Sequence, residues 1–213
     1  MGYQTITGKK GFTQMTPCFS GVGSDYGIQN VLISGSTVVG EGNESLQVVD
    51  SEGNCPESYT WYSAEMMGAA GWYDADFNLS NRVFDKSESF LVNNDAGVYS
   101  IQVAGEVIQA GIAAFPCNAG FTSVGNMTPV AKNIQLFAIS GSAVMGEGNE
   151  SLQFVDEEGN CPESYTWYSA EMMGKAGWYD ADFNLATREV APGEGFLLGN
   201  DAGEYIVSIP GLK

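Results

Sequence analysis

Alternating acidic residues occur twice in the chain, within identical five-residue segments at 74–78 and 180–184. Oxygen-bearing side chains at this spacing open many calcium-binding loops. However, leucine stands where such a loop needs glycine for its sharp turn. We keep two hypotheses: a calcium site of another kind, or alternation on an exposed edge strand with the intervening Phe packed inward. The candidate calcium ligands are Asp74, Asp76, Asn78, Asp180, Asp182 and Asn184.

Aromatic residues precede these segments, and flat rings beside Asp, Glu and Asn side chains suit the binding of a sugar. In a strand, each Trp-Tyr dipeptide places one ring on either face of the sheet, so burial in the core would explain half of the rings. A carbohydrate-binding module is therefore an alternative function. Its candidate ligand-binding residues are Trp61, Trp72, Tyr73, Trp167, Trp178 and Tyr179.

The chain has no histidine, which removes the usual general base and the Ser-His and Cys-His pairs of nucleophilic catalysis. A pair of carboxylates could hydrolyse a glycoside. Such an enzyme usually has one asymmetric cleft, whereas any site here would be present twice in a small unit. We therefore expect no enzyme, no catalytic residues and no cofactor apart from the possible calcium. The carboxylates considered are Glu41, Glu44, Glu57, Glu65, Asp74 and Asp76.

An internal repeat organises the chain. Residues 40–79 return at 146–185, an offset of 106, and 37 of the 40 aligned positions are identical. The following segments, 80–105 and 186–211, share only 10 of 26 positions. The near-copied block reflects either recent duplication or the same surface chemistry kept in both copies. Because solenoid repeats are only about 20–50 residues long, this period indicates two whole domains, at 1–105 and 106–213.

Composition and charge narrow the class of protein. The hydrophobic content of 44% and the 28 glycines indicate a globular, turn-rich chain, and no apolar run is long enough to span a bilayer. The 26 acidic against 8 basic residues give a net charge of −18. Phosphate groups would be repelled by that charge, so we expect no nucleic acid and no membrane insertion.

Each predicted domain contains two cysteines, which suggests one disulfide per domain, Cys18–Cys55 and Cys117–Cys161, out of three possible connectivities. Closing loops of 37 and 44 residues would stabilise the domains by about 3–4 kcal/mol each. The alternative is four buried free thiols.

Short runs of β-branched and aromatic residues alternate with Gly, Asn and Asp turns, and no long amphipathic helix is evident. The pattern predicts an all-β fold with a sandwich or barrel in each domain. One hairpin turn is expected at 50–54 with a glycine at positive φ, and residues 63–67 are too short for more than a helical turn. Residues 12–28 read as irregular. The expected strands are 3–7, 31–33, 46–49, 59–62, 71–74, 89–92 and 98–103, and in the second domain 136–139, 152–155, 165–168, 177–179, 195–198 and 204–209.

Three short motifs resemble repeats in uncharacterised secreted surface proteins of bacteria, in which a Gly-Trp strand precedes a Pro-Gly-x-Gly-Phe strand and a closing Gly-Glu-Val. The second domain carries Gly177-Trp178 and residues 192–196, and the first carries Gly71-Trp72 and residues 105–107. The first domain departs from the pattern at 86–89, where Pro and Gly are missing. The resemblance implies a secreted, non-catalytic repeat and assigns no functional residues.

The connector at 105–114 is apolar rather than a Ser/Pro-rich tether, so we expect the domains to pack together or to share a strand. A similar contact between molecules would be head-to-tail and would build a filament. Segment 107–112 joins the two domains within one molecule. In the filament hypothesis, residues 3–7 make the equivalent contact between the first domain of one molecule and the second domain of the next. The candidate self-association residues are Tyr3, Thr5, Ile6, Val107 and Ile108.

Together these patterns predict a non-catalytic structural or adhesive protein that self-assembles into a surface filament or layer. A carbohydrate-binding module and a calcium-dependent surface domain are the alternatives. Residues 1–12 lack the apolar core of a signal peptide. We therefore expect an extracellular or cell-surface location after removal of a leader, with a virion component as the alternative.

Overall fold

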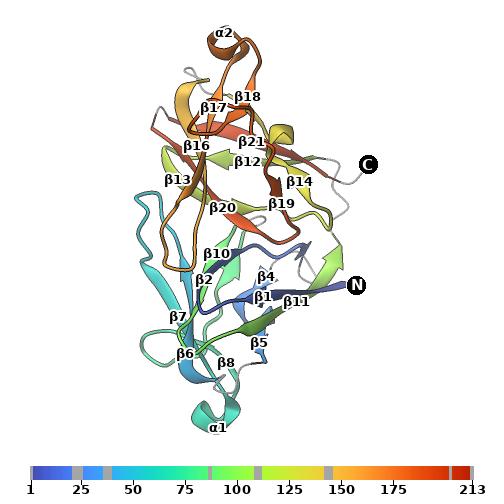
Figure 1. The fold of residues 1–213 in the computed structure, drawn as a ribbon. Coiled ribbons are helices and arrows are strands. Elements are labelled where there is room, and N and C mark those ends of the chain that lie inside the picture. The colour runs from blue at the N-terminus through green and yellow to red at the C-terminus, as the bar shows by residue number, and fades with distance from the viewer. Residues whose placement is uncertain are drawn as a thin grey trace.

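The computed structural model describes residues 2–20, 26–35, 40–85, 88–107, 112–141, 146–201 and 203–211. Antiparallel strands form nearly all of the regular structure (Figure 1), which confirms the all-β class. The helices are single turns, as expected for segments this short. They are η1 (Ile28–Asn30), α1 (Ala64–Met67), η2 (Ile134–Leu136) and α2 (Ala170–Met173).

Eleven strands are described in the first half of the chain: β1 (Gly2–Gly8), β2 (Gly11–Met15), β3 (Phe19–Ser20), β4 (Tyr26–Gly27), β5 (Val31–Ser34), β6 (Glu41–Val48), β7 (Glu57–Tyr62), β8 (Gly71–Tyr73), β9 (Val83–Phe84), β10 (Phe90–Asn94) and β11 (Tyr99–Val107). Ten follow in the second half: β12 (Ile112–Cys117), β13 (Gly120–Gly125), β14 (Lys132–Asn133), β15 (Ala138–Ser140), β16 (Glu147–Phe154), β17 (Glu163–Tyr168), β18 (Gly177–Tyr179), β19 (Glu189–Val190), β20 (Gly195–Asn200) and β21 (Tyr205–Pro210).

Each half is built from a five-stranded sheet, a smaller sheet and a two-stranded sheet, the last being β4-β9 in the first half and β14-β19 in the second. In the first half the five strands follow the order β2-β10-β6-β7-β8, and the smaller sheet joins β1, β3 and β5 to β11. The second half repeats this plan with β13-β20-β16-β17-β18 and β12-β21-β15. One buried hydrophobic cluster draws on the sheets of the first half, and a separate cluster does so in the second. Each half thus has its own core, as the internal repeat predicts, although the predicted boundary after Gly105 falls inside β11.

The hairpin turn at 50–54 is confirmed: β6 pairs with β7 around it, and Gly53 has φ +82°. Strands were missed between residues 12 and 28, which the sequence suggested to be irregular. β2, β3 and β4 lie there, and β2 pairs with β10 along its whole length. Its free edge contacts the other half of the molecule, and every residue of β2 is buried or half-buried, so its sequence lacks the strict alternation of a strand between core and solvent.

The two halves exchange equivalent backbone hydrogen bonds. The Phe12 amide donates to the carbonyl of Glu157 at 2.9 Å, and the Phe121 amide donates to the carbonyl of Ser51 at 2.9 Å. Ser51 and Glu157 are repeat mates, and the two phenylalanines each open the second strand of their half. The tip of each β-hairpin therefore closes on the other half, as in an interface with two-fold symmetry.

Further contacts follow the same reciprocal pattern. A bridge joins Met15 to Glu194, and the equivalent bridge joins Glu88 to Val124. At the centre, the Gln14 side-chain amide donates to the hydroxyls of Ser89 and Ser123, at 3.0 and 3.1 Å. The halves are thus packed together, one of the two arrangements that the apolar connector suggested.

Residues 3–7 lie in β1, which is already paired within the molecule. Tyr3 and Thr5 pair with β11 of the same half, opposite Ala104 and Gln102. The counterpart of β1 in the second half is β12, which pairs with β21. Of the predicted segment 107–112, Val107 ends β11 opposite Phe19 and Ile112 begins β12 opposite Pro210. Ile108 lies outside the described residues.

No helix within the described ranges has the length and apolar character needed to cross a membrane.

Substituting Gly120 by Ala tests the contact between the halves. Gly120 has φ +87°, and a Cβ there would lie 2.3 Å from the backbone oxygen of Ser51. We expect Gly120→Ala to lower the free energy of unfolding by about 3 kcal/mol in a urea titration. The control is Gly174→Ala, where φ is +78° and no atom lies within 4 Å of the added Cβ; it should cost only about 1 kcal/mol of conformational strain. Equal losses in the two variants would contradict the contact.

Candidate functional site

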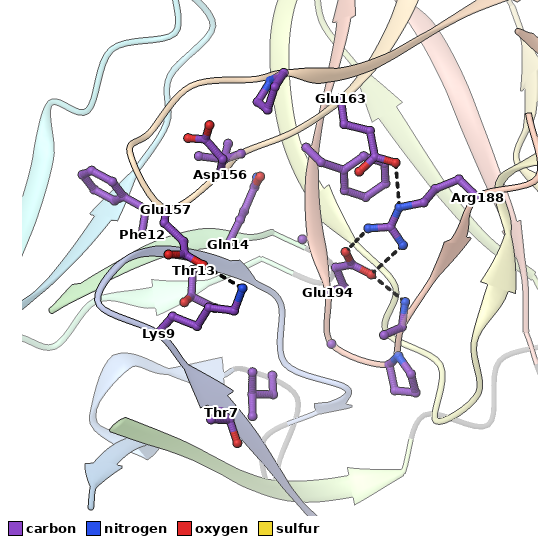
Figure 2. A pocket seen from close by; sticks show the side chains of 18 residues that line it. Thr7, Lys9, Phe12, Thr13, Gln14, Asp156, Glu157, Glu163, Arg188 and Glu194 are labelled. Atoms are coloured by element: carbon purple, nitrogen blue, oxygen red, sulfur yellow. Dashed lines mark hydrogen bonds and ion pairs between the residues drawn. The ribbon is translucent and has the colours of Figure 1, made fainter. Parts of the chain in front are cut away.

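A cavity of about 500 Å³ lies between the halves. Lys9, Phe12 and Gln14 line it from the first half, and Glu157 and Arg188 are among the residues that line it from the second (Figure 2). Its chemistry decides whether an active site is plausible there.

The basic side chains of this cavity are already paired with carboxylates. Arg188 donates from Nε to Glu163 at 2.9 Å and forms an ion pair with Glu194. Burial disfavours the Arg188 charge, but the two carboxylates outweigh it and raise its pKa. Lys9 Nζ lies 2.6 Å from Glu157. A general acid or base needs a carboxylate that can exchange its proton with substrate, and these carboxylates instead hold cations in place.

The cavity is asymmetric although the halves are repeats. Two of the three differences within the near-copied block fall on it: Phe154 replaces Val48, and Glu157 replaces Ser51. The Arg188 guanidinium lies 4.3 Å above the Phe154 ring, a cation–π contact. The Lys9–Glu157 ion pair has no equivalent on the other side, where serine stands in place of Glu157. These differences adapt the two halves to each other.

The acidic segment at 74–78 forms a tight turn. Asp74 donates its backbone amide to the Asn78 carbonyl at 3.0 Å, and its Oδ1 accepts from the amides of Asp76 and Asn78, both at 2.9 Å. These hydrogen bonds, with that of Asn78 first, lower the Asp74 pKa. Phe77 has φ +59°, and its side chain is 60% exposed. We call residues 74–78 and 180–184 the DADFN loops.

The hairpin turn at 50–54 has the same hydrogen bonds as a DADFN loop. The Asp50 amide donates to Asn54 O at 2.8 Å, and Asp50 Oδ1 accepts from the amides of Glu52 and Asn54, at 3.0 and 2.7 Å. The position of Phe77 is taken there by Gly53, at φ +82°. Glycine is the usual residue at positive φ because it has no Cβ to clash. The same chain thus builds this turn once with glycine and once with phenylalanine.

Both DADFN loops carry this feature. Phe183 has φ +60° and is 59% exposed. A bulky residue in the left-handed region is a genuine outlier and costs about 1–2 kcal/mol. The Phe77 ring pairs with Tyr62, with centroids 6.1 Å apart, and Phe183 pairs with Tyr168 at 5.9 Å. An aromatic pair at this separation contributes about 0.5–1.5 kcal/mol, which offsets part of the cost. Folding alone does not account for phenylalanine at these two positions.

The DADFN loops are held rigidly by the strands behind them. The Ser80 amide donates to Trp72 O at 2.8 Å, which closes the loop. The Gln29 side chain binds the chain on both sides of the loop. Its Nε2 donates to Trp72 O and Ser80 O, and its Oε1 accepts from the Trp72 amide; we call this arrangement the Gln29 clamp. Gln135 makes the equivalent bonds in the second half. The exposed rings are therefore presented from fixed positions.

The rings predicted to stack on a sugar are mostly in the core. Trp72 and Trp178 are fully buried, and Trp72 Nε1 donates to Val31 O at 2.8 Å. Trp61, Tyr73 and Tyr179 are also buried, while Trp167 is half-buried. The alternation rule placed one ring of each dipeptide inside, but β8 and β18 are buried on both faces, so both rings of Gly-Trp-Tyr are covered. Their burial leaves no exposed aromatic platform at these residues.

The predicted disulfides are not formed, and all four cysteines are free thiols. Cys18 is buried and directs its thiol toward the carbonyls of Asn126 and Thr128 in the other half, at 3.5 and 3.7 Å. Burial raises its pKa to about 12. Its predicted partner Cys55 is exposed beyond the hairpin turn. In the second half, Cys117 is buried and Cys161 is half-buried.

The candidate calcium ligands do not gather with other acids. Among the described residues, no group of three or more His, Cys, Asp or Glu side chains could hold a metal ion. Asp74 and Asp180 instead stabilise their turns, and Asp180 accepts from the amides of Asp182 and Asn184, at 3.0 and 2.8 Å. The hydrogen bonds within the turn account for the first Asp and the Asn of each segment, whereas Asp76 and Asp182 contribute their backbone amides.

The carboxylates considered for catalysis are scattered. Glu44 is buried and accepts from the Gly40 amide at 3.0 Å, and Glu57 pairs with Arg82 at 2.8 Å. Glu41 and Glu65 are exposed on β6 and α1. What sequence reasoning missed is the exposed Phe77 and its copy, which we expected to pack inward. The sequence did contain a signal for this exposure. Residues 50–54 (DSEGN) align with residues 74–78 (DADFN), and Phe77 then stands at the position of Gly53.

No family model matches the chain, and no curated protein matches it.

Phe77→Gly tests whether the phenylalanine strains its turn. Glycine relieves the left-handed strain but loosens the unfolded chain, so we expect the free energy of unfolding to stay unchanged or to rise by up to about 1 kcal/mol. The control is Val98→Gly, where an equally exposed side chain stands at negative φ and the substitution should cost about 1 kcal/mol. Urea titrations measure both. A loss at Phe77 as large as that at Val98 would show that the ring stabilises the fold.

Glu44 and its repeat mate Glu150, each buried in its own half, should make the free energy of unfolding depend on pH. Burial raises both pKa values, against the hydrogen bonds from Gly40 and Gly146. Their stabilising contribution is therefore complete below the unfolded-state pKa of about 4.3 and is lost as pH rises through the higher folded-state pKa. In the double variant Glu44→Gln and Glu150→Gln, the difference in unfolding free energy between acidic and neutral pH should shrink. An unchanged difference would contradict the raised pKa values.

Proposed function

We propose that this chain is a non-catalytic structural or adhesive module of a surface assembly, acting as a rigid connector with two equivalent ends. The observation that carries the proposal is the placement of the near-copied block. Figure 1 shows α1 and α2 at opposite ends of the molecule, and each helix belongs to one copy of that block. The same surface is therefore presented at both ends of one body.

The positions at which the two repeats are identical support a binding role for the surfaces at the two ends of the molecule. The strands β10 and β11 share the sandwich plan of β20 and β21, yet the segments that contain them have diverged. The fold thus tolerates sequence change. Identity is kept instead in segments such as 64–68 and 75–79, which are almost wholly exposed, although the exposed Ala69 is replaced by Lys175 in the second copy. Exposed residues are not required for packing, so their identity favours a shared binding surface over a structural requirement.

The chemistry of the cavity supports a non-catalytic role. Its arginine and lysine are paired with Glu163, Glu194 and Glu157, and Asp156 caps the hairpin turn by accepting from two backbone amides. These groups make contacts within and between the halves, and their pairing supports a structural use of the charges. An extracellular or cell-surface location is part of the proposal.

Self-association through β1 is the specific route we favour for growth of an assembly. Within the described ranges β1 pairs with β11 alone, so its outer edge is open to a strand from another copy. Tyr3 is 82% exposed and Thr5 is also exposed, while Ile6 is half-buried against the core. We favour this edge-to-edge contact over the arrangement suggested by the sequence, in which residues 3–7 make between molecules the contact that 107–112 make within one.

The proposal is tested on the native protein taken from its source. Gel filtration with light scattering, followed by negative-stain microscopy, should find it in a filament, a layer or a larger complex. The expected mass is many times the 22.6 kDa of one chain. A 22.6 kDa monomer with no associated component would contradict a structural or adhesive role.

A further inference from the structure

The DADFN loops are the feature whose sequence the fold does not explain. The turn at 50–54 shows that the same hydrogen bonds form with Gly53 at the left-handed position. In the DADFN loops, Phe77 and Phe183 take that position and are left 60% and 59% exposed. Strained backbone is commonly found where the side chain has a function.

The geometry is that of a preorganised contact residue. A large ring held in one place loses little entropy when it is buried by a partner, and aromatic residues dominate the energetics of binding surfaces. The Gln29 and Gln135 clamps fix the base of each loop. Tyr62 and Tyr168 support the rings from one side and leave the other side open.

The surroundings of the rings define the chemistry of a partner. Each ring is flanked by two aspartates of its own loop, and the lowered pKa of Asp74 and Asp180 keeps these carboxylates ionised. The net charge of −18 adds a long-range field of the same sign. An apolar pocket that receives the ring must therefore carry basic residues at its rim.

A second copy of this chain fits that description poorly. Its cavity between the halves is lined by four acidic side chains, Asp156, Glu157, Glu163 and Glu194. The two basic residues on it, Lys9 and Arg188, already pair with three of these carboxylates. An acidic loop would meet like charge there, which disfavours binding.

We infer that Phe77 and Phe183 are the contact residues of two equivalent docking loops, each inserting its ring into an apolar pocket with a Lys- or Arg-bearing rim on a partner protein. The inference rests on the proposed connector function and names its binding residues and partner chemistry. Since one chain carries two such loops, it links two partner molecules.

The experiment uses the full chain and an immobilised amphipathic helical peptide of Leu and Lys, about 20 residues long. One comparison peptide of Ser and Lys keeps the charge but has no apolar face, and another of Leu and Glu keeps the apolar face with the opposite charge. We expect the wild-type chain to bind the Leu–Lys peptide at least about tenfold more tightly than either comparison peptide.

The double variant Phe77→Gly and Phe183→Gly keeps every charge of the chain. It should bind the Leu–Lys peptide no better than the Ser–Lys peptide. Each single variant should keep one working loop and dissociate faster than wild type, because the second attachment is lost. Val98→Gly, which removes an equally exposed side chain outside the loops, should bind like wild type. Melting temperatures establish that each variant is folded.

Several outcomes would overturn the inference. They are unchanged binding by the double variant, equal binding to the Leu–Glu peptide, and no wild-type binding to the Leu–Lys peptide. Phe-dependent binding to zwitterionic lipid vesicles would assign the rings to a membrane surface instead, and Phe-dependent dimerisation would assign them to a second copy. The connector function is judged separately, by whether the native protein is assembled. An assembled native protein with unaffected double-variant binding would overturn only the docking loops.

Discussion

The paired hydrogen bonds between the halves determine the shape of this molecule. Phe12 and Phe121 each donate a backbone amide to the hairpin of the opposite half. Gly11 and Gly120, at φ +92° and +87°, allow that hairpin to approach, since a Cβ at either position would lie within 2.3 Å of a carbonyl oxygen. Because the contact is reciprocal, the halves are related by an approximate two-fold axis, and equivalent surfaces point in opposite directions. A tandem repeat joined by a loose tether would not fix its ends in this way.

The DADFN loops combine a strained backbone position with firm attachment to the fold. Asp74 and Asp180 organise the turns through backbone hydrogen bonds, and the Gln29 and Gln135 side chains attach them to the strands behind. Phenylalanine then occupies a position that glycine fills in the related turn. A protein selected for stability alone would place glycine there. Phenylalanine at this position is explained if an exposed ring in a fixed orientation binds a partner. The two packed halves present two such rings, Phe77 and Phe183.

Much of the architecture followed from the sequence, and particular residues explain where prediction failed. The all-β class and the turn at Gly53 follow from alternation and turn composition, which are local properties. The strand β2 was missed because its edge is covered by the other half, a long-range contact that no local pattern encodes. The Trp72 ring was assigned to a binding platform because the sequence does not reveal that β8 is covered on both faces. Phe77 was expected inside because hydrophobicity predicts burial, whereas the turn geometry places its ring outside.

The left-handed, exposed phenylalanine is the claim on which the account most depends, and its backbone angle in solution can be measured. Backbone chemical shifts and three-bond scalar couplings of the isotopically labelled full chain determine φ at Phe77 and Phe183. The account predicts φ near +60° at both residues, with ring protons in contact with solvent and with Tyr62 or Tyr168. A negative φ at these residues, or rings packed into the core, would contradict it.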